Sequence, residues 1–123
     1  MTLMRQQVGQ KGEQAAREYL EQKGYRIIET NYRCRLGEID IIARDGDMVV
    51  IVEVRTKTGL AFGRPEESIN QEKARKLHRL ALQYIQSNYH REVSSRIDLV
   101  AVMIEKSSGL VKDIKHIKNI LAG

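Results

Sequence analysis

The sequence contains few of the residues that cross-link or divide small proteins. Its 123 residues include one cysteine, one proline and no tryptophan. The single cysteine, Cys34, cannot form an internal disulfide bond, and none of the three histidines has metal-ligand spacing to it, which argues against a zinc module. No linker rich in proline or serine interrupts the chain. We therefore expect residues 1–123 to form a single domain.

Long hydrophobic runs are also missing. The longest aliphatic run covers residues 48–52 and is far shorter than the roughly 20 residues of a membrane span. Residues 1–10 lack the apolar core of a signal peptide. These absences predict a cytoplasmic protein that does not associate with a membrane.

Charged residues, by contrast, are abundant and mostly basic. Lysine and arginine number 21 against 16 acidic residues, which gives a formal net charge of +5. This balance favours polyanionic partners such as nucleic acid, although an ordinary basic enzyme has a similar composition. Aromatic residues make up only 5% of the chain, so contact with backbone phosphates is expected rather than stacking on bases.

Hydrophobic periodicity predicts an α/β fold in which a mixed sheet is flanked by helices. The expected order is helix, three-strand meander, helix and strand. Helices are expected over residues 8–23 and from residue 69 to about residue 90; strands are expected at 25–32, 38–44, 48–57 and 96–104. Residues 114–117 form either a short last strand or a turn of helix.

The hairpin between the second and third strands carries three acidic residues. If Asp45-Gly46 is a two-residue turn, Glu38 faces Glu53 and Asp40 faces Ile51. Side chains alternate along a strand, so the three carboxylates share one face of the sheet. A shift of one residue in this register would move Asp40 and Glu53 to opposite faces.

Like charges this close destabilise a sheet unless something compensates them. Carboxylate oxygens suit a hard divalent cation, Mg²⁺ or Mn²⁺, which Glu53 and Asp40 could share. In the alternative interpretation, Glu38 and Asp40 form an exposed polar face, and Glu53 is neutralised by Arg55 or Lys57.

Two motifs give the hairpin a known counterpart. Gly37-Glu38-Ile39-Asp40 and Val52-Glu53-Val54-Arg55 resemble the paired motifs of the PD-(D/E)xK nuclease superfamily. Across residues 8–102 the chain resembles the uncharacterised YraN-like bacterial proteins, a family expected to be endonucleases. The matching positions are Gly12-Glu13, Gly24-Tyr25, residues 37–43, residues 52–56, Phe62-Gly63, Lys73 and Arg96-Ile97-Asp98. The resemblance implies a restriction-endonuclease-like core and phosphodiester hydrolysis, with a likeness to Holliday-junction resolvases.

The resemblance also implies which residues bind the metal. Asp40 and Glu53 match the two acids that hold it, and the carbonyl of Val54 matches a further ligand. Glu13 matches a helical glutamate that completes the site in some branches. Independently, Glu13 lies on the apolar side of its predicted helix, where an acid needs a purpose; pairing with a nearby arginine is the alternative.

The chain departs from the superfamily pattern at Arg55, where a lysine is expected. Arginine stays charged and can stabilise a developing negative charge on phosphate, but it cannot act as a general base. Lys57 lies on the same face and can supply the missing ammonium group. An arginine at this position does not change the expected fold. It makes an inactive nucleic-acid-binding module the alternative to a DNA endonuclease. An RNA nuclease is a further alternative.

Other residues are expected to support the site or to contact nucleic acid. Glu38 is placed beside the metal ligands, and Arg96 is expected to form a supporting salt bridge with Asp98. Lys73 lies near the apolar face of the second helix, from where it can point toward the carboxylates. The expected nucleic-acid contacts are Lys73, Lys76, Arg79 and Arg64, with a solvated helix face as the alternative. The tail, residues 112–118, is a last strand or an arm that docks on a second copy in a homodimer.

Overall fold

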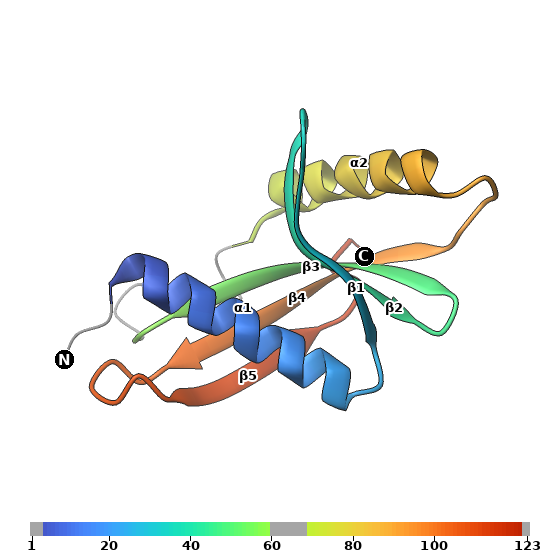
Figure 1. Ribbon diagram of the computed structural model, residues 1–123. Coiled ribbons are helices and arrows are strands. Elements are labelled where there is room, and N and C mark those ends of the chain that lie inside the picture. The colour runs from blue at the N-terminus through green and yellow to red at the C-terminus, as the bar shows by residue number, and fades with distance from the viewer. Residues whose placement is uncertain (1–3, 60–68, 122–123) are drawn as a thin grey trace.

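The computed structural model describes residues 4–59 and 69–121. Its helices and strands follow the predicted order (Figure 1). They are α1 (Arg5–Gln22), β1 (Arg26–Cys34), β2 (Gly37–Asp45), β3 (Met48–Lys57), α2 (Gln71–Asn88), β4 (Ser95–Ile104) and β5 (Val111–Ile117). The weak last segment is therefore a strand. Within the described ranges, neither helix is long and apolar enough to cross a membrane.

The strands form one mixed sheet in the order β1-β2-β3-β4-β5. The meander β1–β3 is antiparallel, as predicted, and β5 is antiparallel to β4. β3 and β4 run parallel, because the chain returns through α2 before it re-enters the sheet. This α/β arrangement is consistent with the predicted restriction-endonuclease-like core.

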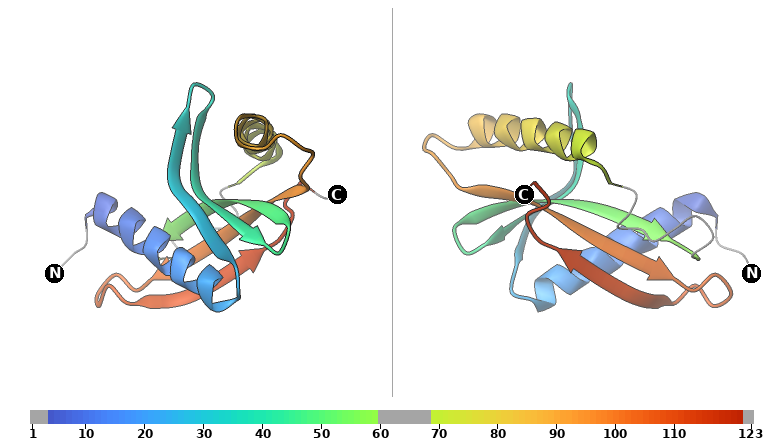
Figure 2. Two further views of the ribbon diagram at one scale, coloured as in Figure 1. Left: turned by 45° about the vertical axis from the view of Figure 1, so that its right-hand side comes forward. Right: turned by 180° about the vertical axis from the view of Figure 1, so that it is seen from behind.

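The two helices cover opposite faces of the sheet (Figure 2). Leu20 of α1 belongs to a buried cluster with Val52, whereas Leu77 of α2 belongs to a second cluster with Ile51. Val52 and Ile51 are neighbours on β3, and their side chains point to opposite faces because strand side chains alternate. Central strands buried on both faces explain why β3 and β4 are almost continuously apolar.

The β2–β3 turn differs from the predicted one. Asp45 pairs with Met48, so the turn residues are Gly46 and Asp47 rather than Asp45 and Gly46. Gly46 has φ +62°, which suits the first central position of a tight hairpin turn. Arg96 also forms an ion pair of 3.2 Å with Asp45, which remains at the end of its strand. The register therefore moves by two residues, and an even shift leaves every side chain on its predicted face.

β2 separates from β3 partway along the hairpin. Their last paired residues are Ile41 and Val52. Beyond this point the β1–β2 hairpin rises away from the sheet toward α2 (Figure 1), and Ile39 joins the cluster on the α2 side. The end of β3 past Val52 consequently lacks a β2 neighbour. On the β2 side, the main chain of β3 past Val52 is left open to contacts with side chains.

Candidate active site

Asp40 and Glu53 meet where β2 separates from β3. They are the residues next to the last backbone pair, Ile41 and Val52. The Val54 N–H donates a hydrogen bond of 2.8 Å to Asp40 Oδ2, so a carboxylate takes the place of the missing β2 main chain. The predicted facing of Glu38 with Glu53, and of Asp40 with Ile51, is wrong because the turn lies one residue further on. The corrected register brings Asp40 and Glu53 closer than predicted.

Glu53 is buried among charged groups from two elements. Only 5% of the residue is exposed. Arg55 Nη2 lies 3.0 Å from Glu53 Oε2, and Lys73 Nζ, from α2, lies 3.6 Å from the same oxygen. Lys73 thus points toward the carboxylates, as its position near the apolar face of the helix suggested. It brings an ammonium group to the acid that has Arg55 in place of the superfamily's lysine.

The Glu53 carboxyl holds its proton unusually well. Burial raises its pKa to about 7, and the nearby charge of Asp40 acts in the same direction. Lys73 and Arg55 lower the pKa but do not cancel these effects, and a hydrogen bond with Asp40 also favours the protonated form. The two ion pairs of Glu53 therefore do not fully neutralise this site: near neutral pH the Asp40–Glu53 pair still binds a proton readily.

Glu13 approaches the same end of β3 from α1. α1 packs so closely on β3 here that a Cβ added to Gly12 would lie 1.8 Å from Thr56 Oγ1. Burial raises the pKa of Glu13, and the charges of Asp40 and Glu38 raise it further. Glu13 also lines a pocket of about 330 Å³ with Arg5, Val8, Gly9, Val54, Arg55, Thr56 and Lys57. α1 thus brings a third carboxyl group, which lies close enough to Asp40 for the two charges to repel each other.

Arg55 offers this pocket an unused hydrogen-bond donor. Its Nη2 pairs with Glu53, but its Nε is buried and has no hydrogen-bond partner among the described residues. A buried donor without a partner is costly, and a planar guanidinium binds phosphate oxygens well. Lys57 lines the same pocket. The predicted proximity of these two cations to the acids is therefore present.

The donor set fits a divalent cation that is only partly held by protein. Within residues 4–59 and 69–121, no three His, Cys, Asp or Glu side chains form a ready-made metal group. Mg²⁺, however, is commonly bound through one or two carboxylates plus water and substrate phosphates. Asp40 and Glu53 provide such a pair, and burial together with the charge of Asp40 raises the pKa of Glu53, which a bound cation would offset. Ligation by Glu13 and by the Val54 carbonyl stays a prediction.

The other predicted contacts are scattered around the site. Glu38 forms an exposed ion pair of 3.1 Å with Arg33 across the β1–β2 hairpin. Lys76 and Arg79 are exposed on α2, and the Lys76 side chain passes close to Gly37 on the raised hairpin. Arg64 lies outside the described residues.

Arg96 and Asp98 form the predicted salt bridge, but on the other face of the sheet. Arg96 Nε lies 3.0 Å from Asp98 Oδ1. Asp98 pairs in register with Val52, which faces α1, whereas the neighbouring Glu53 contacts α2. The same carboxylate also bonds His116, at 2.7 Å. The role of His116 could not be predicted from the sequence, where its only signal is a polar residue in the last strand.

Comparisons with known proteins agree along most of the chain. The sequence model of the Uncharacterised protein family UPF0102 matches residues 12–102. A UPF0102 protein of Desulforamulus reducens is 46% identical over 123 residues, which is 98% of this chain and 100% of the relative. A UPF0102 protein of Moorella thermoacetica is 47% identical over 106 residues, or 86% of this chain and 88% of the relative. One from Pelotomaculum thermopropionicum is 43% identical over 115 residues, or 94% and 95%.

Proposed function

The chain belongs to the Uncharacterised protein family UPF0102, and for this member we propose a cytoplasmic, Mg²⁺- or Mn²⁺-dependent endonuclease that hydrolyses phosphodiester bonds in DNA. The family match confirms the resemblance to YraN-like proteins. The activity is our inference from the residues at the separation of β2 and β3. Its substrates are branched or processed DNA, in keeping with the resemblance to junction resolvases.

The Asp40–Glu53 pair is the observation that carries this proposal. Two adjacent acids, one of them 5% exposed, destabilise the fold unless positive charge is supplied. Arg55 and Lys73 supply part of it. A site that keeps like charges together in this way is typical of function rather than of stability.

Each basic residue has a separate task in the proposed reaction. Arg55 donates its unpaired Nε–H to a phosphate oxygen and stabilises the charge that develops there. Lys57, from the same pocket, contacts the flanking backbone. Lys73 keeps the Glu53 carboxylate in place through its ion pair.

The acids position the cation and move the proton. Asp40 and Glu53 would hold the Mg²⁺ or Mn²⁺, and when bound the ion supplies positive charge to the phosphate and lowers the pKa of water. Glu13 would accept a proton from the attacking water at its carboxylate. Its raised pKa makes it a better base than an ordinary exposed glutamate.

One feature favours a nucleic-acid-binding module without catalysis as the second candidate. Arg55 already occupies an oxygen of Glu53 at 3.0 Å, so the cation would have to compete with this ion pair. A basic chain can still bind phosphates through its lysines and arginines when this exchange does not occur.

The test is cleavage of labelled duplex, single-stranded, flap and four-way-junction DNA, with matching RNA, in Mg²⁺ and in Mn²⁺. The wild type should cleave DNA, and the variants Glu53→Gln and Asp40→Asn should not. Each variant loses a charged metal ligand while the side-chain shape is kept. Glu92→Gln is the matched control, since it removes one acidic charge at an exposed position after α2.

The outcomes separate the two candidates. DNA cleavage that is lost in both site variants and kept in the control supports the endonuclease. Equal residual cleavage by all four proteins contradicts it. In that case, salt-dependent DNA binding that survives Asp40→Asn and Glu53→Gln supports the binding module.

A further inference from the structure

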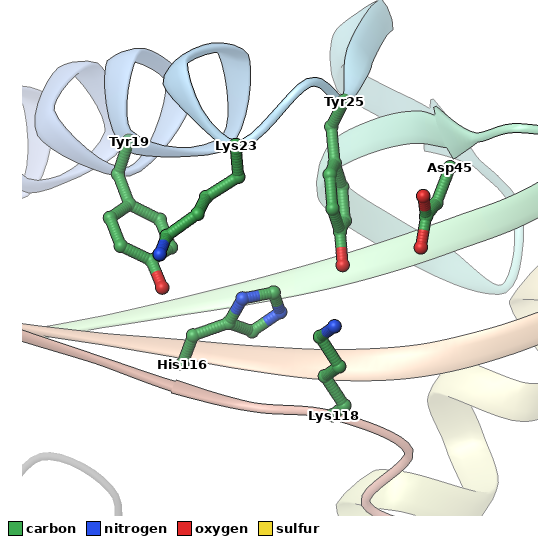
Figure 3. Close-up of a pocket in the computed structure, with 6 residues that line it drawn as sticks. All are labelled: Tyr19, Lys23, Tyr25, Asp45, His116 and Lys118. Atoms are coloured by element: carbon green, nitrogen blue, oxygen red, sulfur yellow. The ribbon is translucent and has the colours of Figure 1, made fainter.

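A second pocket lies at the C-terminal end of α1 and takes no part in the proposed cleavage (Figure 3). Its volume is about 320 Å³, at the lower end of the range for small-molecule sites. Lys23 is ten residues beyond Glu13, which is roughly 15 Å along a helix. The lining residues are Tyr19, Lys23, Tyr25, Asp45, His116 and Lys118.

Asp98 lies behind the pocket and holds His116, one of the lining residues, in place. It is fully buried and accepts hydrogen bonds from Arg96 Nε at 3.0 Å and from the Asn119 N–H at 3.0 Å. Its Oδ2 lies 2.7 Å from His116 Nε2. Burial would raise the pKa of Asp98, but hydrogen bonds from His116 and Arg96 hold it below its ordinary value. The carboxylate is therefore ionised and can only accept hydrogen bonds.

The ionised carboxylate fixes the orientation of His116. Nε2 must carry a proton, because Asp98 has none to donate. Tyr19 and Tyr25 pack against the imidazole edge to face, with centroid distances of 5.7 and 5.8 Å. Nδ1 then lies on the pocket side of the ring (Figure 3), and no hydrogen bond joins it to another residue of the described chain. With the proton on Nε2, Nδ1 can only accept a hydrogen bond, and the Asp98 contact fixes the ring as a rigid wall of the pocket.

The remaining polar groups of the pocket are mainly donors. Lys23 and Lys118 bring two ammonium groups, and Lys23 Nζ lies over the Tyr19 ring at 5.6 Å. The Tyr25 hydroxyl accepts a hydrogen bond from Arg96 Nη2 at 2.5 Å, which leaves its own hydrogen free to donate. Among the described residues of the lining, Asp45 is the one with an acidic side chain, and its carboxylate is paired with Arg96 at 3.2 Å. The lining is therefore positively charged overall.

We propose that this pocket binds a phosphate group through Lys23, Lys118 and Tyr25 Oη. Phosphate presents only acceptor oxygens when fully ionised, and it matches donors that converge from several elements. A carboxylate has fewer oxygens for these three donor groups, and an apolar ligand would leave the ammonium groups desolvated. The phosphate comes either from the end of a nucleic acid strand or from a small phosphorylated molecule.

The test follows backbone amide signals by NMR while four probes are added separately. They are inorganic phosphate, thymidine 5′-monophosphate, and one single-stranded oligonucleotide with a 5′-phosphate or a 5′-hydroxyl. We expect the phosphate-bearing probes to shift the signals of Lys23, Tyr25, His116 and Lys118. The signals of Lys106 and Lys112, which are exposed outside the pocket, should not move with inorganic phosphate.

Paired lysine variants separate a built site from general attraction. Lys23→Gln with Lys118→Gln should weaken binding of thymidine 5′-monophosphate roughly tenfold or more, because two charge-assisted contacts are lost. Lys106→Gln with Lys112→Gln is the control; it removes the same charge from exposed positions outside the pocket. The control pair should keep wild-type affinity.

Each outcome decides the proposal. Stronger binding of the 5′-phosphate than of the 5′-hydroxyl oligonucleotide identifies a nucleic acid end, whereas binding of the small probes alone identifies a small phosphorylated ligand. Either result supports the site. Equal loss of affinity in both variant pairs, or no shift at the pocket with any probe, overturns it. The readout involves no cleavage, so a failed nuclease assay leaves this proposal standing.

Discussion

Glu53 and Asp98 are two buried acids that lie almost side by side, yet the protein treats them oppositely. Asp98 pairs in register with Val52, the neighbour of Glu53, and points to the α1 face while Glu53 contacts α2. The exposed fraction is 5% for Glu53 and 0% for Asp98. The pKa of Asp98 is nevertheless lowered, whereas the pKa of Glu53 is raised to about 7.

The difference lies in the neighbours and not in burial. Both oxygens of Asp98 have donors, from Arg96, His116 and the Asn119 main chain. Glu53 has two cations on a single oxygen and the like charge of Asp40 beside it. A satisfied buried acid stabilises a fold, whereas one that is left short of positive charge indicates a functional site. The comparison therefore assigns a structural role to Asp98 and a chemical role to Glu53.

The largest effect should come from removing the charge of Asp98. Asp98→Asn leaves Arg96 without its buried counter-charge and His116 without its carboxylate acceptor, and we expect a loss of about 3–5 kcal/mol in the free energy of unfolding. Urea denaturation at pH 7 measures it. Glu53→Gln is the comparison variant and should cost far less, because it also removes the repulsion from Asp40. Equal losses in the two variants would remove the distinction between the sites.

The pH dependence of stability should have opposite signs at the two acids. The folded state keeps a proton on Glu53 up to about pH 7, while the unfolded chain releases it near pH 4.5. Stability from this group therefore falls as pH rises from about 4.5 to 7. Relative to wild type, Glu53→Gln should gain a few kcal/mol between pH 5 and pH 8. Denaturation curves at both pH values measure the difference, and an unchanged difference would show that Glu53 titrates normally.

Asp98 gives the matching control for this sign. Its folded pKa is lowered, so its contribution is present above the unfolded value of 3.8 and is lost as pH falls through the folded value. Between pH 5 and pH 8 both states are ionised. The stability difference between Asp98→Asn and wild type should consequently stay constant over the window in which Glu53 changes.

A divalent cation should stabilise one side of the comparison only. If Mg²⁺ or Mn²⁺ binds Asp40 and Glu53 in the folded state, a concentration ten times Kd adds about 1.4 kcal/mol. A thermal shift assay with each metal should show a higher Tm for the wild type and for Glu92→Gln. Asp40→Asn and Glu53→Gln should show none. A shift of equal size in every variant would indicate binding elsewhere.

The sequence was sufficient for the element order because long periodic segments leave little choice. The apolar stretches of β3 and β4 and the amphipathic pattern of α2 each fit one element type. The hairpin register was predicted wrongly, since the choice between Asp45-Gly46 and Gly46-Asp47 as the turn depends partly on the ion pair between Asp45 and the distant Arg96. Asp40 and Glu53 kept their shared face only because the shift was even.

The contacts between distant elements were harder to predict from the sequence. Lys73 could be placed near the acids from its position on the helix, and this agrees with its ion pair to Glu53. The Asp98–His116 contact could not be found, because it joins β4 to β5 with a register that no local pattern determines. Short-range patterns predict which face a side chain occupies, whereas pairing between strands decides what it touches.

The smallest effect should come from Glu38, which the sequence placed among the acids of the site. Its carboxylate pairs with Arg33 at 3.1 Å, and the side chains are 55% and 79% exposed. Water screens such a pair, so Glu38→Gln should change the free energy of unfolding by less than about 1 kcal/mol. It should also leave the metal-induced rise in Tm intact, because a cation held by Asp40 and Glu53 does not need this side chain. Loss of that rise in Glu38→Gln would mean that the raised hairpin contributes a ligand and that the site is larger than the pair.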